Sequence, residues 1–555
     1  MAAVLEDVRN AFRKLARMVR PAVTITDPPA GIVFERDVPV VMRDGVTLRV
    51  NVFRPEVPGR YPVLLCAHPY GKDRLPSRAR WGGGYRIPKQ YRLMAQSEPL
   101  THSAWTSWEA PDPAHWVPRG YVVVNADLRG WGHSEGTGEL LSEQEGIDCH
   151  DLIEWAAARD WSNGRVGMTG VSYLAITQWA AAATRPPHLA AINPWEGFTD
   201  AYRDFAYPGG IREDGFTILW STLQRLQRRS PVTFRRDQKA NPLDNAWWRA
   251  RNREIERIDV PALVCASFSD HNLHARGSFD GFRRIGSERK WLYTHRGPKW
   301  ATYYGREALA AQERFFDQFL RGDDTGMLDE PTVRLEIRED ARTISSVRGV
   351  DHWPPREAVA RRLYLSATHR SLENRCPEAA ASLSVEGKGV PFRFEYRFDA
   401  TTDVVGPMWL TLYISTERDD LPVFAGVRKV VDGREVGFEG SYGFDRALVT
   451  HGWLLASHRD LDEAKSTEWE PYHPHDRRLP LSPGAVMRLD IGLLPSATRF
   501  HAGETLVLEL RDRWFFPRNP LLGQFPAGYL GGNGGRWNVH TGPEYPSALR
   551  IPALT

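Results

Sequence analysis

Ser172 lies in the segment "RVGMTGVSYLAITQW", where an apolar run, a glycine, the serine and a helical pattern follow one another directly. A serine on a strained turn between a strand and a helix can act as a nucleophile, because its hydroxyl projects clear of the sheet and the helix N-terminus directs N–H groups at the same point. Gly170 leaves room for such a turn, although Leu174 and then Ala175 stand where a second glycine is usual. The alternative is that Ser172 only caps the following helix.

A serine hydroxyl needs a base to take its proton, and the base needs a group that orients it. In a strand-turn-helix arrangement of this kind, the expected chain order is serine, acid, histidine. The apolar run "PALVCASFSD" ends at Asp270 and the run "RKWLYTH" ends at His295, so we predict these two residues as acid and base. His271 and His274 are set aside, because they share the loop or helix after Asp270 and lie too near it in sequence to approach the serine from the other side.

Negative charge that develops on a carbonyl oxygen during acyl transfer must be stabilised by hydrogen-bond donors. The N–H of Tyr173, directly after the serine, is the first predicted donor. The second should come from the loop after an earlier strand, and "VLLCAHPYGKD" places Tyr70 there. We predict the Tyr70 hydroxyl as this donor, with the backbone N–H of Gly71 as the alternative.

The elements that must carry these residues follow from the apolar pattern. From about residue 34 to residue 300, short apolar runs alternate with helical stretches, which predicts an α/β domain with a mostly parallel sheet and helices on both faces. We assign residues 34–195 and 259–355 to this catalytic domain. Residues 196–258 carry helical stretches without a clear strand and are predicted to form a helical cap over the carboxyl ends of the strands.

The pattern changes after about residue 358. The segments "FRFEYRF", "MWLTLYIST", "VMRLDIGLL" and "TLVLELRD" are strand-like, and no long helical period accompanies them. Residues 356–555 are therefore predicted as an all-β sandwich of the jelly-roll type. Residues 1–33 form an N-terminal extension with an amphipathic helix that packs on the body of the protein or on a second subunit.

Aromatic residues at the start of the cap suggest the substrate. Trp195, Phe198 and Tyr202 are predicted to line an apolar acyl pocket, which favours esters of bulky or aromatic acids. An enzyme that acts on peptides or amino-acid esters needs a carboxylate to hold the substrate's ammonium group. Glu196 and Asp200 are the candidates, and the sequence does not rank them above ordinary surface charges.

Composition narrows the classes of partner and compartment. The formal net charge is only +3 over 555 residues, which gives no reason to expect nucleic acid or an anionic membrane as partner. The four cysteines include no C-x-x-C pair, and the charged N-terminus lacks the apolar core of a signal or a membrane span, so we expect a reduced, cytoplasmic protein. No cofactor or metal is expected, since the two histidines of "HPHD" at 473–476 belong to a polar, solvated loop. A homodimer is left open.

Several motifs together resemble one family. "HPYGK", "DLRGWGHSEG", "GVSYLA", "SDHNLHARGSFDGF" and "THRGPKW" are similar to segments of the cocaine esterase, X-Pro dipeptidyl-peptidase and alpha-amino acid ester hydrolase family (CocE/NonD type) of alpha/beta hydrolases. "WLLASHRDLD" and "PSATRFHAGETLVLEL" resemble parts of the family's C-terminal jelly roll. The resemblance implies a hydrolase domain, a cap and a jelly roll that helps to wall the site, and it supports the oxyanion role of Tyr70.

The leading hypothesis is a serine carboxylesterase that forms an acyl-enzyme on a small-molecule ester. A second hypothesis is an X-Pro dipeptidyl-peptidase or amide acylase. A third is a catalytically silent fold in which the jelly roll binds a carbohydrate or a partner. A complete set of Ser172, Asp270 and His295 argues against the third.

Overall fold

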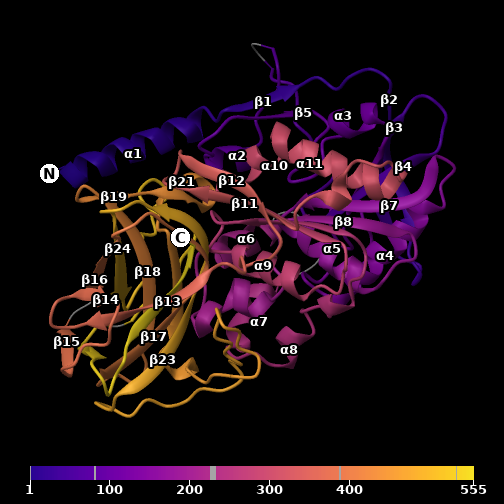
Figure 1. Cartoon of the computed structure of the whole chain (residues 1–555). Helices are drawn as coiled ribbons and strands as arrows, with labels where there is room; N and C mark the ends of the chain where they lie inside the picture. Colours follow the sequence, from indigo (N-terminus) through magenta and orange to yellow (C-terminus); the bar gives the residue numbers. More distant parts are fainter. Residues whose placement is uncertain are drawn as a thin grey trace.

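The computed structural model describes residues 2–80, 83–225, 233–386, 389–524, 526–532 and 534–554. Figure 1 shows two parts side by side: an α/β part that carries most of the helices, and a β-rich part formed by the last third of the chain. Within the described residues, no helix combines the length and the apolar character that are needed to cross a bilayer.

The α/β part is built on one sheet with the strand order β2-β3-β6-β4-β7-β8-β9-β10-β11-β12. Its strands from β6 to β11 are parallel, while β2, β3 and β12 pair antiparallel at the two edges. The strands are β2 (Ile32–Val41), β3 (Thr47–Pro55), β4 (Tyr61–His68), β6 (Val122–Asp127), β7 (Ser162–Val171), β8 (Leu189–Trp195), β9 (Ala262–Ser267), β10 (Lys290–His295), β11 (Val333–Arg338) and β12 (Ile344–Val350).

Helices cover both faces of this sheet, and for that reason its central strands are apolar on both sides. One face packs against α4 (Glu143–Ala157), α5 (Tyr173–Ala183) and α9 (Ala275–Arg284). The other face packs against a group that includes α3 (Pro113–Trp116), α10 (Lys299–Tyr303), α11 (Arg306–Phe316) and η5 (Asp317–Arg321). The mostly parallel sheet with helices on both faces, which the alternating pattern predicts, is therefore present, and it agrees with the alpha/beta-hydrolase fold that the resemblance implies.

Between β8 and β9 the chain forms a set of short helices, at the place where the cap was predicted. They are η2 (Ala201–Ala206), η3 (Pro208–Gly210), α6 (Phe216–Arg225), α7 (Phe234–Ala240), α8 (Ala246–Arg249) and η4 (Ile255–Arg257). Residues 226–232 of the predicted cap lie outside the described residues. Figure 1 shows α6, α7 and α8 between the sheet and the β-rich part, so the cap borders both.

The β-rich part is a sandwich with its own apolar core. One layer contains β13, β26, β17, β23, β25 and β15, and the other contains β16, β24, β18 and β22, with β14 joining β13 to β16. Its strands are β13 (Val359–Ser366), β14 (Ser371–Glu373), β15 (Ala381–Val385), β16 (Phe392–Arg397), β17 (Thr402–Thr416), β18 (Pro422–Val431), β19 (Arg434–Val436), β20 (Phe438–Gly440), β21 (Phe444–Ala447), β22 (Thr450–Leu455), β23 (Met487–Phe500), β24 (Thr505–Arg511), β25 (Trp537–Thr541) and β26 (Ala548–Leu554).

The N-terminal segment contacts both parts. Helix α1 (Ala2–Val19) lies along the β-rich part (Figure 1), where Lys14 Nζ donates to the Gly523 carbonyl at 3.4 Å and Arg17 pairs with Asp445 at 3.5 Å. The short strand β1 (Val23–Thr26) then pairs with β5 (Leu100–Ser103), which belongs to the long insertion after β4. That insertion also carries α2 (Lys89–Met94). The amphipathic helix therefore packs on the body of the same chain.

Candidate active site

Ser172 sits on a sharp turn at the end of β7. Its backbone has φ 62° and ψ −114°, a conformation that costs a non-glycine residue strain and that concentrates at functional sites. The Ser172 N–H donates to the Trp195 carbonyl at 3.0 Å, which ties the turn to the end of β8. Helix α5 begins at the next residue, Tyr173.

Small residues make this turn possible. A Cβ on Gly170 would lie 2.6 Å from the Cβ of Leu174, and a Cβ on Gly197 would lie 2.6 Å from the Cβ of Ala175. The turn therefore needs glycines at 170 and 197, while Leu174 and Ala175 fill the space that those glycines leave. This explains why the usual glycine after the serine is dispensable here.

The imidazole that meets the serine belongs to His274. Ser172 Oγ lies 2.9 Å from His274 Nε2, and the second ring nitrogen, Nδ1, accepts the Phe198 N–H at 3.2 Å. The Phe198 ring stacks on the imidazole with centroids 5.6 Å apart. His274 directly precedes α9, and its backbone N–H donates to the Asp270 carbonyl at 3.2 Å. A tight turn therefore brings this histidine back over the serine.

The assignment of His295 as the base is corrected by this geometry. His295 is 1% exposed, its Nε2 lies 3.1 Å from Glu196 Oε1, and its ring stacks on Trp195 with centroids 5.9 Å apart. Side chains of a strand alternate between the two faces of the sheet, and His295 is the last residue of β10, with its ring on the face that holds Trp195. The imidazole is therefore committed to Glu196 rather than to Ser172.

Asp270 lies at the predicted edge of the sheet, but its side chain is bound to a lysine and a serine rather than to an imidazole. Its Oδ1 accepts the Ser441 hydroxyl of the β-rich part at 2.8 Å, and its Oδ2 is paired with Lys299. Lys299 follows β10, and its Nζ also lies 3.6 Å from Glu196 Oε2. Although burial opposes it, the Lys299 ammonium holds the pKa of Asp270 below its ordinary value. Asp270 is thus a charged, buried neighbour of His274.

Burial, followed by the nearby Lys299 charge, holds the pKa of His274 well below its ordinary value, while Asp270 acts in the opposite direction. The neutral imidazole therefore persists below pH about 6.5, the usual histidine pKa. We expect the acid limb of a pH profile of kcat/KM to lie below that pH. Lys299→Gln should move the limb upward, because it removes a positive charge, and Lys239→Gln on the exposed cap helix α7 should not. Stopped assays between pH 4 and 9 measure this, and an unmoved limb in Lys299→Gln would contradict it.

Two donors face the place where an oxyanion would form. Burial raises the pKa of the Tyr70 phenol well above its ordinary value, although the neighbouring Trp220 of the cap and Ser172 oppose that shift. It therefore stays protonated and able to donate. Tyr173 is the first residue of α5, so its N–H has no acceptor four residues earlier within the helix. Asp127 Oδ1 accepts the Lys72 N–H at 2.7 Å and so holds the loop that carries Tyr70.

Tyr70→Phe removes one of these donors and leaves the ring in place. We expect kcat to fall by about 10²-fold with a small change in KM, because an oxyanion donor acts mainly in the transition state. Initial rates on a p-nitrophenyl ester measure both constants. Tyr207→Phe is the matched control, because its hydroxyl donates to the Gln238 carbonyl within the cap. A fall in kcat/KM carried by KM alone would show that Tyr70 binds substrate and does not stabilise the oxyanion.

The predicted acyl pocket is corrected in two of its three residues. Trp195 is fully buried and packs against Tyr293 and His295, while Tyr202 is fully buried and donates its hydroxyl to the Pro242 carbonyl. Both rings serve packing. Only Phe198 lies against the site, on the imidazole of His274. Trp220 was not among the residues predicted for the pocket, although its place in the apolar segment "FTILWSTLQR" was an available signal.

Glu196 and Asp200, the two carboxylates considered for a substrate ammonium group, both have partners within the protein. Glu196 is fully buried and paired with His295, and Asp200 accepts the N–H groups of Tyr202 and Arg203 at 2.9 Å each. Both candidate carboxylates are therefore already engaged. A third carboxylate, Glu109, accepts the Trp300 indole N–H at 3.1 Å, and burial raises its pKa to about 8.

Two places in the structure combine histidine with other residues of the types that bind metals. Ligand atoms of Glu196, Cys265 and His295 lie within 4.8 Å of one another. Burial raises the pKa of the Cys265 thiol, which keeps it protonated, and the Lys299 ammonium already lies 3.6 Å from Glu196 Oε2. This donor set does not fit a cation. His473 contacts two backbone carbonyls at 2.7 Å each and is 8% exposed, so the histidine at 473 is buried and not solvated as expected.

A serine on a strained strand-helix turn, an imidazole on its hydroxyl and two oxyanion donors above a parallel sheet define a serine hydrolase of the alpha/beta type. Comparison with known proteins agrees. Residues 44–298 match the X-Pro dipeptidyl-peptidase (S15 family) model, and residues 325–549 match the X-Pro dipeptidyl-peptidase C-terminal non-catalytic domain. Cocaine esterase of Rhodococcus sp. (strain MB1 Bresler) is 37% identical over 93% of this chain and 98% of its own.

Solved structures give the same result. A CocE/NonD family hydrolase from Staphylococcus aureus is 34% identical, with a TM-score of 0.87 over 96% of this chain and 99% of its own. An alpha-amino acid ester hydrolase, 16% identical, shares the fold with a TM-score of 0.72 over 96% of this chain and 98% of its own. The chain belongs to the family of cocaine esterase and the S15 X-Pro dipeptidyl-peptidases, and the predictions of this family, of its fold and of a hydrolase are confirmed.

Proposed function

We propose that the protein hydrolyses carboxylic esters through an acyl-enzyme on Ser172, with His274 as the proton acceptor. The observation that carries the proposal is the 2.9 Å contact between Ser172 Oγ and His274 Nε2 on the strained turn. In the first step the serine oxygen attacks the ester carbonyl and its proton passes to His274. Tyr70 and the Tyr173 N–H donate to the oxyanion, the alkoxide leaves with the proton from His274, and water repeats these steps on the acyl-enzyme.

The tautomer of His274 is part of this mechanism. With Nδ1 accepting the Phe198 N–H at 3.2 Å, the hydrogen of the resting imidazole lies on Nε2, toward Ser172 Oγ. To accept the serine proton, Nε2 must offer its lone pair, so the ring hydrogen has to reside on Nδ1. The catalytic tautomer therefore gives up the Phe198 contact, and the negative charge of nearby Asp270 favours the imidazolium that follows.

Two features favour esters over peptides with a free N-terminus. Glu196 and Asp200, the carboxylates considered for a substrate ammonium group, are bound to His295 and to the start of η2. The side chains beside the serine are aromatic instead, with Trp220 next to Tyr70 and Phe198 on His274. Such walls bind apolar acyl groups, which supports the proposal of bulky or aromatic acyl groups. Some relatives are named esterases and others peptidases. One of the latter is a "Putative Xaa-Pro dipeptidyl-peptidase" of Bacillus anthracis, which is 28% identical over 45% of this chain and 46% of its own.

A panel of substrates tests this proposal. We expect kcat/KM to rise from p-nitrophenyl acetate to p-nitrophenyl benzoate and phenylacetate by about tenfold, which corresponds to about 1.4 kcal/mol of added apolar contact. Glycyl-prolyl-p-nitroanilide should be hydrolysed at least about 10³-fold more slowly. Initial rates by absorbance measure all of these, with Ser172→Ala as the background. Faster turnover of the prolyl anilide than of every ester would replace this proposal by the peptidase.

We also propose that the enzyme works in the reducing cytoplasm on a small-molecule substrate. All four cysteines are free thiols, and those of Cys66, Cys149 and Cys265 are buried in the α/β part. Fractionation of the native host with an antibody against the protein tests this, and recovery from the periplasm or culture medium would contradict it.

A further inference from the structure

Helix α1 packs on the body of the protein with its polar side and leaves its apolar side uncovered. Asn10 and Lys14 face inward and are 9% and 6% exposed. Phe12, Leu15 and Val19 face outward and are 67%, 41% and 59% exposed. Surface helices of globular proteins usually have the reverse orientation, with the apolar stripe toward the core. None of the three outward side chains belongs to an apolar core of the described residues.

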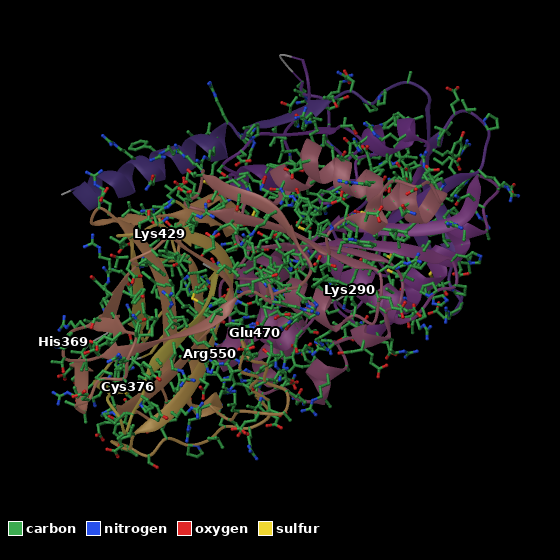
Figure 2. All side chains as sticks on the ribbon, in the orientation of Figure 1. Lys290, His369, Cys376, Lys429, Glu470 and Arg550 are labelled. Atoms are coloured by element: carbon green, nitrogen blue, oxygen red, sulfur yellow. The ribbon has the colours of Figure 1, made fainter. Side chains whose placement is uncertain are left out.

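The inward contacts fix the helix in this orientation. Lys14 and Arg17 are bound to the β-rich part, and Arg92 Nη1 of α2 donates to the Val19 carbonyl at 2.5 Å. Figure 1 shows α1 along the outer margin of the molecule, and Figure 2 shows side chains projecting from it on the side away from the β-rich part. A rotation that buried the apolar stripe on the body would break these contacts. A cover for the stripe must therefore come from outside the described part of the chain.

A row of positive charge runs beside the apolar stripe. Arg9, Arg13 and Arg20 are exposed, and they form no ion pair among the side chains that the structure describes. Their spacing of four and seven residues places them in one row along the helix, and Arg9 stands three residues before Phe12 on the neighbouring row. Residues 2–20 contain five basic and two acidic residues, a net charge of +3 that equals the formal net charge of the whole chain.

We propose that α1 docks the protein on an anionic lipid surface. A helix with an apolar stripe flanked by basic residues lies in the plane of the interface, where the stripe enters the acyl boundary and the arginines meet the headgroups. The membrane leaflet that faces the cytoplasm carries such anionic lipids. The overall charge of the chain gives no reason to expect this partner, but the charge of this one helix does.

A second copy of the chain is the other candidate for covering the stripe. It would present the same positively charged helix, and the described part of that helix holds no row of acids to pair with the arginines. Like charges brought together at an interface repel one another, whereas anionic headgroups attract them. The charge beside the stripe therefore favours a lipid surface over self-association.

The test is co-sedimentation of the full-length protein with vesicles of phosphatidylcholine alone or of phosphatidylcholine mixed with phosphatidylglycerol. We expect binding to the mixed vesicles to be at least about tenfold tighter, and to weaken at high salt. Phe12→Gln/Leu15→Gln should weaken binding to the mixed vesicles at least about tenfold, because it removes the apolar contact. Val41→Gln/Val57→Gln is the matched control, since these two side chains of the α/β part are 68% and 69% exposed.

The arginine row has its own pair of variants. Arg9→Gln/Arg13→Gln should weaken binding to the mixed vesicles about 30-fold, from about 1 kcal/mol for each basic residue near an anionic surface. It should leave the weaker binding to phosphatidylcholine alone unchanged. Arg370→Gln/Arg375→Gln removes two exposed arginines of the β-rich part and is the matched control. These arginines flank the segment before Cys376, which Figure 2 labels well away from α1.

Absence of binding to the mixed vesicles, equal binding to both kinds of vesicle, or unchanged binding in either α1 variant would each overturn the proposal. Light scattering without lipid should give the same mass for the unmodified protein and for Phe12→Gln/Leu15→Gln. A dimer that this variant converts to a monomer would assign the stripe to a second copy instead. Melting temperatures show that each variant is folded. Ser172→Ala should bind vesicles as the unmodified protein does, so this test is independent of the ester-hydrolase proposal.

Discussion

His274→Gln is expected to lower kcat/KM for a p-nitrophenyl ester by about 10³- to 10⁴-fold, the usual effect of losing the base of a serine hydrolase. His295→Gln should change it by less than about tenfold. The structure places only the first of these imidazoles on the serine, with Nε2 at 2.9 Å from Ser172 Oγ. The second is bound to Glu196 at 3.1 Å and its ring stacks on Trp195.

The same replacement is used at both positions so that the comparison isolates the role of each ring. Glutamine can donate to Glu196 from its amide, which avoids leaving that buried carboxylate without a partner in His295→Gln. Melting temperatures of both variants show whether either loss reflects unfolding. Equal losses of 10³-fold in two folded variants, or a larger loss in His295→Gln, would restore His295 as the base.

Much of the fold follows from local pattern, because strands and helices of an α/β sheet are long, apolar and regular. The runs that end at His68, Val171 and Ser267 are strands of the predicted parallel sheet. The elbow was also predictable, since Gly170 and Ser172 stand between such a strand and the Ala-rich helix α5. The position of Tyr70 followed from the same rule, because it comes just after a central strand.

The identity of the catalytic base could not be predicted from the sequence, because it depends on the geometry of the turn after Asp270. The N–H groups of Leu273, His274 and Ala275 all converge on the Asp270 carbonyl at 3.1 to 3.3 Å. This compact turn reverses the chain within four residues and directs His274 toward the serine. His274 had been set aside because it is only four residues from Asp270. The tight turn nevertheless points its side chain at the serine, so closeness in sequence did not exclude it.

The place of His295 shows a second limit of the sequence. It pairs with Ser267 across β9 and β10, so it belongs to the strand and not to the loop beyond it. The strand end was predicted at the correct residue, but the face was not, because side chains alternate along a strand and the ring of residue 295 lies on the face of Trp195. In the loop after β10 it is Lys299 that pairs with Asp270, through Oδ2. The other carboxylate oxygen, Oδ1, accepts the hydroxyl of Ser441, which belongs to the β-rich part. No pattern in the sequence connects residues so far apart.

Ser172→Ala should lower kcat/KM by about 10⁴-fold or more and abolish covalent labelling by a fluorophosphonate, because it removes the attacking oxygen itself. The double variant Ser172→Ala/His274→Gln should be no slower than Ser172→Ala alone, since a base has no proton to accept when the hydroxyl is absent, and residues that act as a unit are not additive. Ser482→Ala, on an exposed loop of the β-rich part, should retain both rate and labelling. Labelling that persists in Ser172→Ala would place the nucleophile elsewhere. A further large loss in the double variant would show that His274 acts on the substrate independently of the serine.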